Sequence, residues 1–347
     1  CLRLVGSEMC IRDSIDTLNG KEVKRPPVWF MRQAGRILPS YQNLKLKYTF
    51  DELMKDKRLA AEVTLLPIDD LGVDTAILFS DILIIPESLG LRLEFTDRGP
   101  KFFNPITENS SNKLILDTSK LDHVYSNIKQ VKHQSDVPLI GFCGGPLTTF
   151  LFMFRGDETD KSFKGAIDFF NKNKSESLKI MDKITEVSIE YVKSQIQAGI
   201  DCFQLFETYC GIIPAEDYKE LILPFSIKIL NAARGLETPT IFFPKNFNSG
   251  LKYINKDICD FVGIDSKISL EKARQIVDQN VGIQGNMDPR IFYTSYDEIQ
   301  NYLEGLVNFG SKNNDWIFNI GRGFMPDIDH QKVKFVVDWV KKTNWKR

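Results

Sequence analysis

Two arginines and one aspartate are the residues of this sequence best placed to do chemistry, because each follows an apolar run. Arg32 and Arg36 stand four residues apart in the segment RQAGR, and Asp81 lies between the runs TAILFS and ILIIP. If the RQAGR turn is helical, both guanidinium groups project from one side, where they could bind carboxylates or phosphates bidentately. An aspartate enclosed by apolar residues needs partners. Taken singly, the arginines are explained equally well as solvated surface residues. For Asp81 taken singly, a structural role such as capping a loop is the more common one.

Eight short, β-rich apolar runs predict the strands that position these residues. They span 28–33, 75–81, 138–144, 202–207, 239–243, 260–265, 281–285 and 316–321. Most are apolar throughout, as in parallel strands buried on both faces. Segments of helical period lie between them, at 57–71, 178–198, 218–233, 270–277, 296–307 and 331–340. This alternation predicts right-handed βαβ units. Eight strands favour one (β/α)8 TIM barrel, although a doubly wound sheet also fits the pattern.

In such a barrel the functional groups lie at the C-terminal ends of the strands. Besides RQAGR and Asp81, the strand ends carry Gly144-Gly145, Glu207-Thr208-Tyr209, Pro244-Lys245 and Gly321-Arg322-Gly323. Several cations, one aspartate and flexible glycine turns predict a pocket for a polyanion.

Composition narrows the class of protein. The 347 residues are 42% hydrophobic and carry a formal net charge of −1, which argues against a general nucleic-acid binder. The three histidines show no HExxH or HxH spacing, so we expect no histidine-based metal site. The six cysteines form no CxxC pair, which favours reduced thiols and a cytoplasmic protein. We expect residues 1–13 to be an extraneous or disordered extension, and 14–347 to form one domain.

Five segments together carry a family resemblance. They are PPVWFMRQAGRILPSY (26–41), ILFSDILIIPESLG (77–90), GFCGGPLT (141–148), QGNMDP (284–289) and FNIGRG (318–323). In order and spacing they resemble the uroporphyrinogen decarboxylases, from about Ser14 to the C-terminus. A chance match to both RQAGR and FSDIL is very improbable.

The resemblance implies a homodimeric barrel with a deep cleft at the C-terminal face. It implies decarboxylation of the four acetate side chains of uroporphyrinogen III to give coproporphyrinogen III, without cofactor or metal. By resemblance, Asp81 is the catalytic residue and accepts pyrrole N–H groups. Arg32 and Arg36 hold substrate carboxylates, and the other substrate-binding residues are Gln33, Ala34, Phe152, Thr208 and Arg322.

Two positions depart from the family pattern. The family commonly has histidine where this chain has Arg322, and often tyrosine where it has Phe152. Arginine does not titrate near neutral pH, so Arg322 could replace a carboxylate-binding histidine but not one that moves a proton. These changes leave two alternatives open. One is a binding protein that holds a porphyrinogen or another polyanion without turnover. The other is a relative of the corrinoid-dependent methyltransferases, whose zinc ligands are not found here after the run 239–243.

Overall fold

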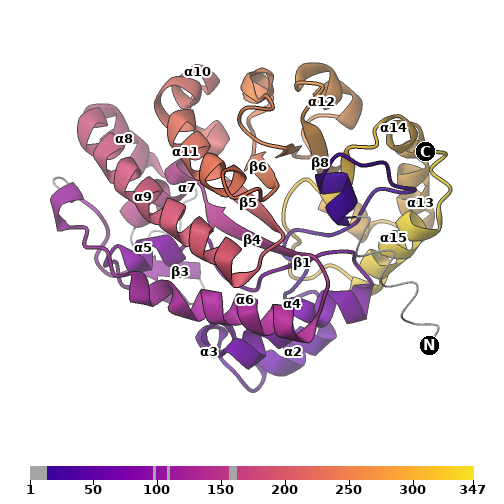
Figure 1. The fold of residues 1–347 in the computed structure, drawn as a ribbon, viewed down its shortest axis with the longest axis horizontal. Helices are drawn as coiled ribbons and strands as arrows, with labels where there is room; N and C mark the ends of the chain where they lie inside the picture. The colour runs from indigo at the N-terminus through magenta and orange to yellow at the C-terminus, as the bar shows by residue number, and fades with distance from the viewer. Residues whose placement is uncertain (1–13, 97–98, 108–109, 156–161) are drawn as a thin grey trace.

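Seven parallel strands form a curled sheet at the centre of the computed structural model, which describes residues 14–96, 99–107, 110–155 and 162–347 (Figure 1). The strands are β1 (Ala76–Ile77), β4 (Leu139–Gly144), β5 (Cys202–Glu207), β6 (Thr240–Pro244), β7 (Phe261–Gly263), β8 (Gly282–Met287) and β9 (Trp316–Ile320), paired in that order. The hairpin β2 (Leu93–Thr96) and β3 (Gly99–Phe102) lies outside this sheet. The sequence therefore predicted seven strands correctly. The extension expected at residues 1–13 lies outside the described residues.

The eighth expected strand, 28–33, forms a single bridge rather than a ladder. Val28 bridges Phe318 of β9, and the Val28 carbonyl accepts a hydrogen bond from Asp74 N at 2.9 Å, two residues before β1. The segment thus lies between the two edge strands. It cannot extend further as a strand for two reasons. Pro26 and Pro27 lack N–H groups, and a turn follows in which Gln33 N donates to the Phe30 carbonyl. What the structure shows is a curled seven-stranded sheet.

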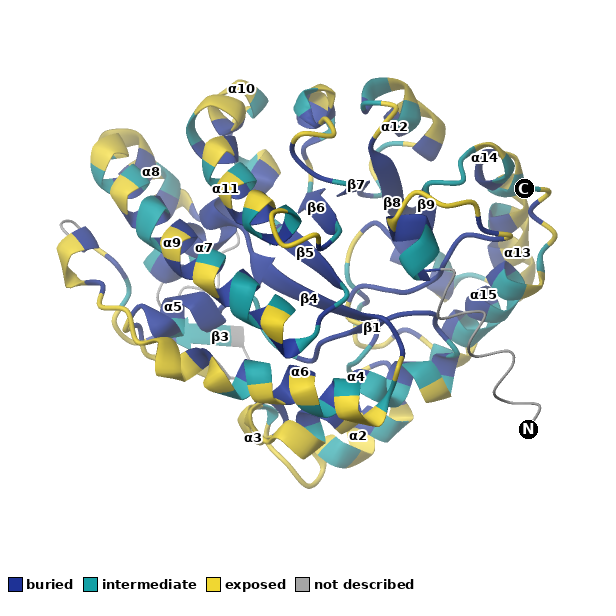
Figure 2. Cartoon of the chain, in the orientation of Figure 1, coloured by how far each residue is buried: buried dark blue, intermediate teal, exposed yellow. Residues whose placement is uncertain are grey.

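Helices surround the sheet on its outer side. They are α2 (Pro39–Lys45), α3 (Phe50–Lys55), α4 (Lys57–Leu71), α5 (Ile84–Ser88), α6 (Asp122–Gln134), α7 (Pro146–Arg155), α8 (Lys164–Lys172), α9 (Lys174–Ala198), α10 (Ala215–Asp217), α11 (Leu223–Arg234), α12 (Leu270–Ile276), α13 (Tyr296–Gly305), α14 (Val307–Lys312) and α15 (His330–Lys342). Short helical turns are η1 (Ser111–Lys113), η2 (Thr118–Leu121), η3 (Cys210–Ile212), η4 (Tyr218–Ile222), η5 (Asn248–Tyr253) and η6 (Pro289–Tyr293). The helices α4, α6, α9 and α11 pack side by side, with buried faces toward the sheet (Figure 2).

Local signals explain where the two helices best predicted from the sequence begin and end. Asp56 caps α4 by accepting hydrogen bonds from Arg58 N and Leu59 N, and Gly72 ends it in the left-handed region with φ 74°. Gly199, with φ 115°, ends α9 in the same way. Among the described residues, no helix has the length and apolar character that crossing a membrane requires.

Asp74 holds the 28–33 segment against the sheet. Its side chain is buried, and its carboxylate accepts hydrogen bonds from Val28 N at 2.8 Å and from two Arg25 nitrogens at 2.6 and 2.8 Å. Lys341 of α15 forms a further ion pair with it at 3.2 Å. The carboxylate therefore joins three parts of the chain that are distant in sequence, and its charge is compensated by two cations.

Replacing Asp74 by alanine should destabilise the fold by about 3–5 kcal/mol, because the buried Arg25 would lose the carboxylate that accepts two of its hydrogen bonds. Urea denaturation followed by circular dichroism measures the loss. Asp16→Ala is the matched control, because the Asp16–Lys21 pair is solvent-exposed and contributes at most about 1 kcal/mol. Equal effects of the two substitutions would contradict the structural role given to Asp74.

Candidate active site

The candidate residues gather at the edge of the sheet where the parallel strands end. Arg32, Gln33, Ala34 and Arg36 lie in the turn after the Val28 bridge, Asp81 follows β1, Thr208 follows β5, Arg322 follows β9, and Phe152 lies in α7 after β4. Because all seven strands point the same way, their carboxyl ends lie at one edge. The topology therefore places together residues that the sequence separates by as many as 290 positions, from Arg32 to Arg322.

Arg32 joins the first and last of these segments. It adopts φ 65°, uncommon for a residue with a side chain, and its side chain is exposed. A Cβ added at Gly323 would lie 2.6 Å from Arg32 Cδ, so the arginine side chain packs directly over the Gly323 backbone. Only glycine leaves room for this contact. Arg322, the next residue back, is exposed on the same turn.

Gln33 has a different environment from its neighbours in the turn. It is fully buried, its Oε1 accepts a hydrogen bond from Phe30 N, and its Nε2 donates to the Thr75 carbonyl, both at 2.9 Å. The side-chain amide therefore braces the turn against the start of β1. Ala34 is half-buried and Arg36 is exposed.

Asp81 lies in the turn between β1 and α5. Its Oδ1 accepts a hydrogen bond from Leu83 N at 2.8 Å. Burial raises the pKa of the Asp81 carboxyl, and the Leu83 N–H and the charge of Arg32 oppose this rise. The raised pKa marks a carboxylate held in a poorly solvated site, with Arg32 close enough to act on it.

Phe152 and Thr208 lie beside Tyr209. The Phe152 ring meets the rings of Phe163 and Tyr209 edge-to-face, at centroid distances of 5.4 and 5.8 Å. Phe152 is only partly buried, as is Thr208 at the end of β5. The rings form an apolar wall, and the position where the family often has a tyrosine hydroxyl is here a ring without one.

Lys245 is a cation at this edge that the sequence interpretation did not name as a binding residue. It follows β6 and is half-buried. Burial lowers the pKa of the Lys245 ammonium, and repulsion from Arg322 and Arg32 lowers it further. The signal available in the sequence was a lysine ending an otherwise apolar run, IFFPK.

Glu207, the last residue of β5, was placed at a strand end by the sequence but was given no role there. It is fully buried, and its carboxylate accepts hydrogen bonds from Thr148 N at 2.7 Å and Leu147 N at 3.2 Å at the start of α7, and from the Thr148 hydroxyl. Tyr218 of the π-helical turn η4 donates to it from 3.4 Å. Gly145 leaves space for this carboxylate, since a Cβ there would lie 2.4 Å from Glu207 Oε2.

The Glu207 contacts fix neighbours of the site. Thr148 Oγ1 accepts a hydrogen bond from Tyr209 N at 3.2 Å, which ties the end of β5 to the helix that carries Phe152. Burial raises the pKa of Glu207 to about 7, although these hydrogen bonds act in the opposite direction. The run CFQLFE placed Glu207 at a strand end but gave no sign of its partners, which lie about 60 residues earlier in the chain.

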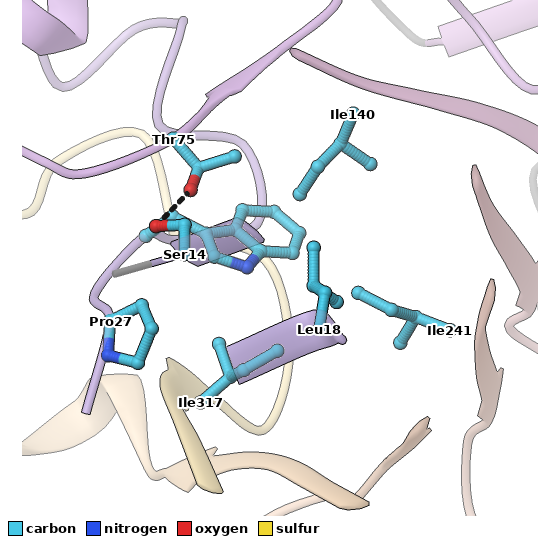
Figure 3. A pocket seen from close by; sticks show the side chains of 8 residues that line it. Ser14, Leu18, Pro27, Thr75, Ile140, Ile241 and Ile317 are labelled. Carbon is cyan, nitrogen blue, oxygen red and sulfur yellow. Dashed lines mark hydrogen bonds between the residues drawn. The ribbon is translucent and has the colours of Figure 1, made fainter. Parts of the chain in front are cut away.

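An apolar pocket lies at the opposite edge of the sheet. Its lining consists of apolar and hydroxyl-bearing residues: Ser14, Leu18, Pro27, Trp29, Thr75, Ile140, Ile241 and Ile317. The Ser14 and Thr75 hydroxyls meet across it at 3.0 Å (Figure 3). Ile140, Ile241 and Ile317 stand near the start of their strands, so this pocket belongs to the N-terminal side. Among the described residues, no cluster of three or more His, Cys, Asp or Glu side chains could hold a metal ion.

Comparison with known proteins identifies the family. The profile of the family described as Uroporphyrinogen decarboxylase (URO-D) matches residues 12–343. A uroporphyrinogen decarboxylase of Geobacter sulfurreducens is 37% identical over 343 residues, which cover 96% of this chain and 98% of that protein. The one of Chloroherpeton thalassium is 34% identical over 340 residues, covering 95% and 96%.

This chain belongs to the uroporphyrinogen decarboxylase family.

Solved structures of other proteins share its fold. A methyltransferase from Methanosarcina mazei superimposes with a TM-score of 0.77 at 16% sequence identity, covering 96% of this chain and 98% of that one. A B12-independent methionine synthase from Shewanella gives a TM-score of 0.55 at 15% identity, covering 85% and 91%. At such identities the likeness shows the fold alone.

Glu207→Gln should change how stability depends on pH in this uroporphyrinogen decarboxylase family member. Because folding raises the pKa of Glu207 from 4.5 to about 7, the wild-type protein has a contribution to stability that is present below pH 4.5 and is lost as the pH rises through about 7. The glutamine variant lacks this dependence. The difference in unfolding free energy between the two proteins should therefore shift by on the order of 3 kcal/mol across this range.

Chemical denaturation at pH 5 and pH 8 measures the shift. Glu62→Gln, on the exposed side of α4, is the control and should run parallel to wild type. A constant difference between wild type and Glu207→Gln at both pH values would show that Glu207 titrates like a solvated glutamate.

Proposed function

We propose that this protein decarboxylates the four acetate side chains of uroporphyrinogen III and releases coproporphyrinogen III. The observation that carries the proposal is the combination of family membership over residues 12–343 with a desolvated Asp81 carboxylate that Arg32 influences at the strand ends. The relatives named uroporphyrinogen decarboxylase support the same reaction.

The substrate itself supplies the electron sink in the proposed reaction. A proton adds to the pyrrole carbon next to the ring nitrogen and produces an iminium-like ring. The bond from the acetate methylene to its carboxylate then breaks, carbon dioxide leaves, and the bonding electrons neutralise the ring. The methylene finally takes up a proton while the ring loses its extra one, so each acetate becomes a methyl group with one net proton consumed. No redox step occurs in this sequence.

Asp81 would stabilise the cationic ring. An ionised carboxylate only accepts hydrogen bonds and offers about four acceptor positions, which matches four pyrrole N–H groups directed inward. A fixed charge in a poorly solvated site acts more strongly than in water. The position of Asp81 after β1, held by Leu83 N, supports this role.

The exposed arginines would bind the carboxylates of the substrate. Arg32, Arg36 and Arg322 are exposed, and none of them forms a salt bridge with another part of the described chain. Phe152 and Thr208 would contact the substrate with a ring face and a hydroxyl. Gln33 would act mainly by holding the turn, and Ala34 by lining it.

Four further properties belong to this proposal. The 28–33 segment would close the sheet into an eight-stranded barrel, which its hydrogen bonds to β9 and to Asp74 support. The family resemblance supports a homodimer and catalysis without a cofactor. The buried free thiols of Cys143, Cys202, Cys210 and Cys259 are consistent with a cytoplasmic location.

Anaerobic incubation of the purified protein with chemically reduced uroporphyrinogen III tests the function. The products are oxidised and separated by their number of carboxylates. Porphyrins with seven to four carboxylates are expected. Unchanged eight-carboxylate material from folded protein would instead favour a binding protein without turnover, and zinc bound by the purified protein would favour the methyltransferase alternative.

Asp81→Asn should lower kcat by about 100-fold or more while the fold is retained, because the amide removes the negative charge that stabilises the cationic ring. Asp338→Asn, a similar change on α15, should leave kcat at the wild-type value. The product assay and circular dichroism measure both variants. Full activity of Asp81→Asn would rule out the role given to this carboxylate.

A further inference from the structure

Lys245 faces the interior of the curled sheet. Side chains alternate along a strand, so Ile241, Phe243 and Lys245 share one face. Ile241 lines the pocket enclosed by the strands, and the Phe243 ring meets the Phe206 ring from the neighbouring strand at 6.1 Å. Lys245 N donates to the Glu207 carbonyl at 3.2 Å and so continues the ladder beyond β6. The Lys245 side chain therefore leaves the backbone on the same face of the sheet as Phe243, two residues further toward the C-terminal ends of the strands.

The register places Thr208 beside Lys245. Glu207 pairs with Pro244 at the end of the β5–β6 ladder. The next residues of the two strands, Thr208 and Lys245, are then neighbours, and each is partly buried. The backbones of these two residues are thus adjacent, one residue beyond the paired rings of Phe206 and Phe243.

Lys245 has no acidic partner among the described residues, although it is withdrawn from solvent. Asp265 is the carboxylate close enough to act on its charge. Both carboxylate oxygens of Asp265 accept hydrogen bonds from the backbone, one from Asn246 N at 2.6 Å and the other from Lys267 N at 2.8 Å. Asp265 therefore braces the adjoining loops, and no salt bridge joins Lys245 to the described part of the chain.

Two arginines approach Lys245 from other elements. The loop that contains Asp265 and Ser266 packs against Gly321, where a Cβ would lie 2.3 Å from Ser266 N. Arg322 follows Gly321, and Arg32 packs over Gly323. Through these contacts three cations from three segments converge on one side of the strand ends. Arg322 and Arg32 repel the half-buried Lys245, and a bound anion would offset that repulsion.

We propose that Lys245 binds a carboxylate of the substrate in a subsite that Arg322 and the Thr208 hydroxyl complete. This proposal rests on the proposed function, in which the substrate carries eight carboxylates. It also gives Arg322 a reason to be arginine rather than histidine. An arginine keeps its charge beside a repelling lysine, whereas a histidine there would become neutral.

Lys245→Gln should lower kcat/KM about tenfold or more, through KM rather than kcat, because a charge-assisted contact to a substrate carboxylate is lost. Lys245→Arg should retain most of the affinity, because it keeps the positive charge. Lys272→Gln removes the same charge from the exposed face of α12 and should behave as wild type. Steady-state kinetics with reduced uroporphyrinogen, and circular dichroism for folding, are the measurements.

The pH profile is the second readout. Repulsion and burial lower the pKa of Lys245, so its charge is lost at a lower pH than that of a solvated lysine, and KM should rise there. Lys245→Arg should shift that rise to higher pH. An unchanged KM in Lys245→Gln, or equal loss in Lys245→Gln and Lys245→Arg, would overturn the subsite. Absence of product from the wild-type protein would instead refute the proposed function.

Discussion

The reciprocal hydrogen bonding between Asp74 and Val28 is the constraint on which the candidate site depends. Asp74 N donates to the Val28 carbonyl at 2.9 Å, and Val28 N donates to the Asp74 carboxylate at 2.8 Å. Arg25 and Lys341 compensate the buried charge. Because Val28 also bridges β9, one carboxylate fixes the segment between the two edges of the sheet. The turn that carries Arg32 and Arg36 follows directly and lies at the strand ends.

Two glycines allow side chains from other segments to pack directly against the backbone, which brings the groups of the candidate site together. At Gly323 the missing side chain lets Arg32 lie over the turn after β9, and at Gly145 it lets the Glu207 carboxylate reach the first turn of α7. A methyl group at either position would meet heavy atoms at 2.6 Å or less. The position of these charged groups therefore depends on the absence of a side chain at Gly323 and Gly145.

Charged side chains are distributed unevenly in this protein, although its net charge is almost zero. The net charge of −1 gives no hint that Arg32, Lys245 and Arg322 face one region at the strand ends. Arg25 and Arg274, by contrast, are paired with Asp74 and Asp315. An excess of cations at the strand ends suits the carboxylate-rich substrate that we propose, and the partly buried Asp81 lies at the same edge of the sheet.

The sequence by itself determined the family, most strand and helix positions, and the strand tips that carry Arg32, Asp81, Thr208 and Arg322. These follow from local signals: apolar runs, helical spacing, caps such as Asp56, and motifs that are contiguous in the chain. Only the tertiary structure decided that residues 28–33 form a bridge and not a strand. It likewise decided that the Gln33 side chain is hydrogen-bonded to backbone groups. It also decided which groups Glu207 contacts and which charges act on Lys245, two residues that the sequence had placed only at strand ends. Each of these outcomes depends on partners that are 40 or more residues away or on a neighbouring strand. The pattern of residue types along a chain does not indicate which of its distant groups come into contact.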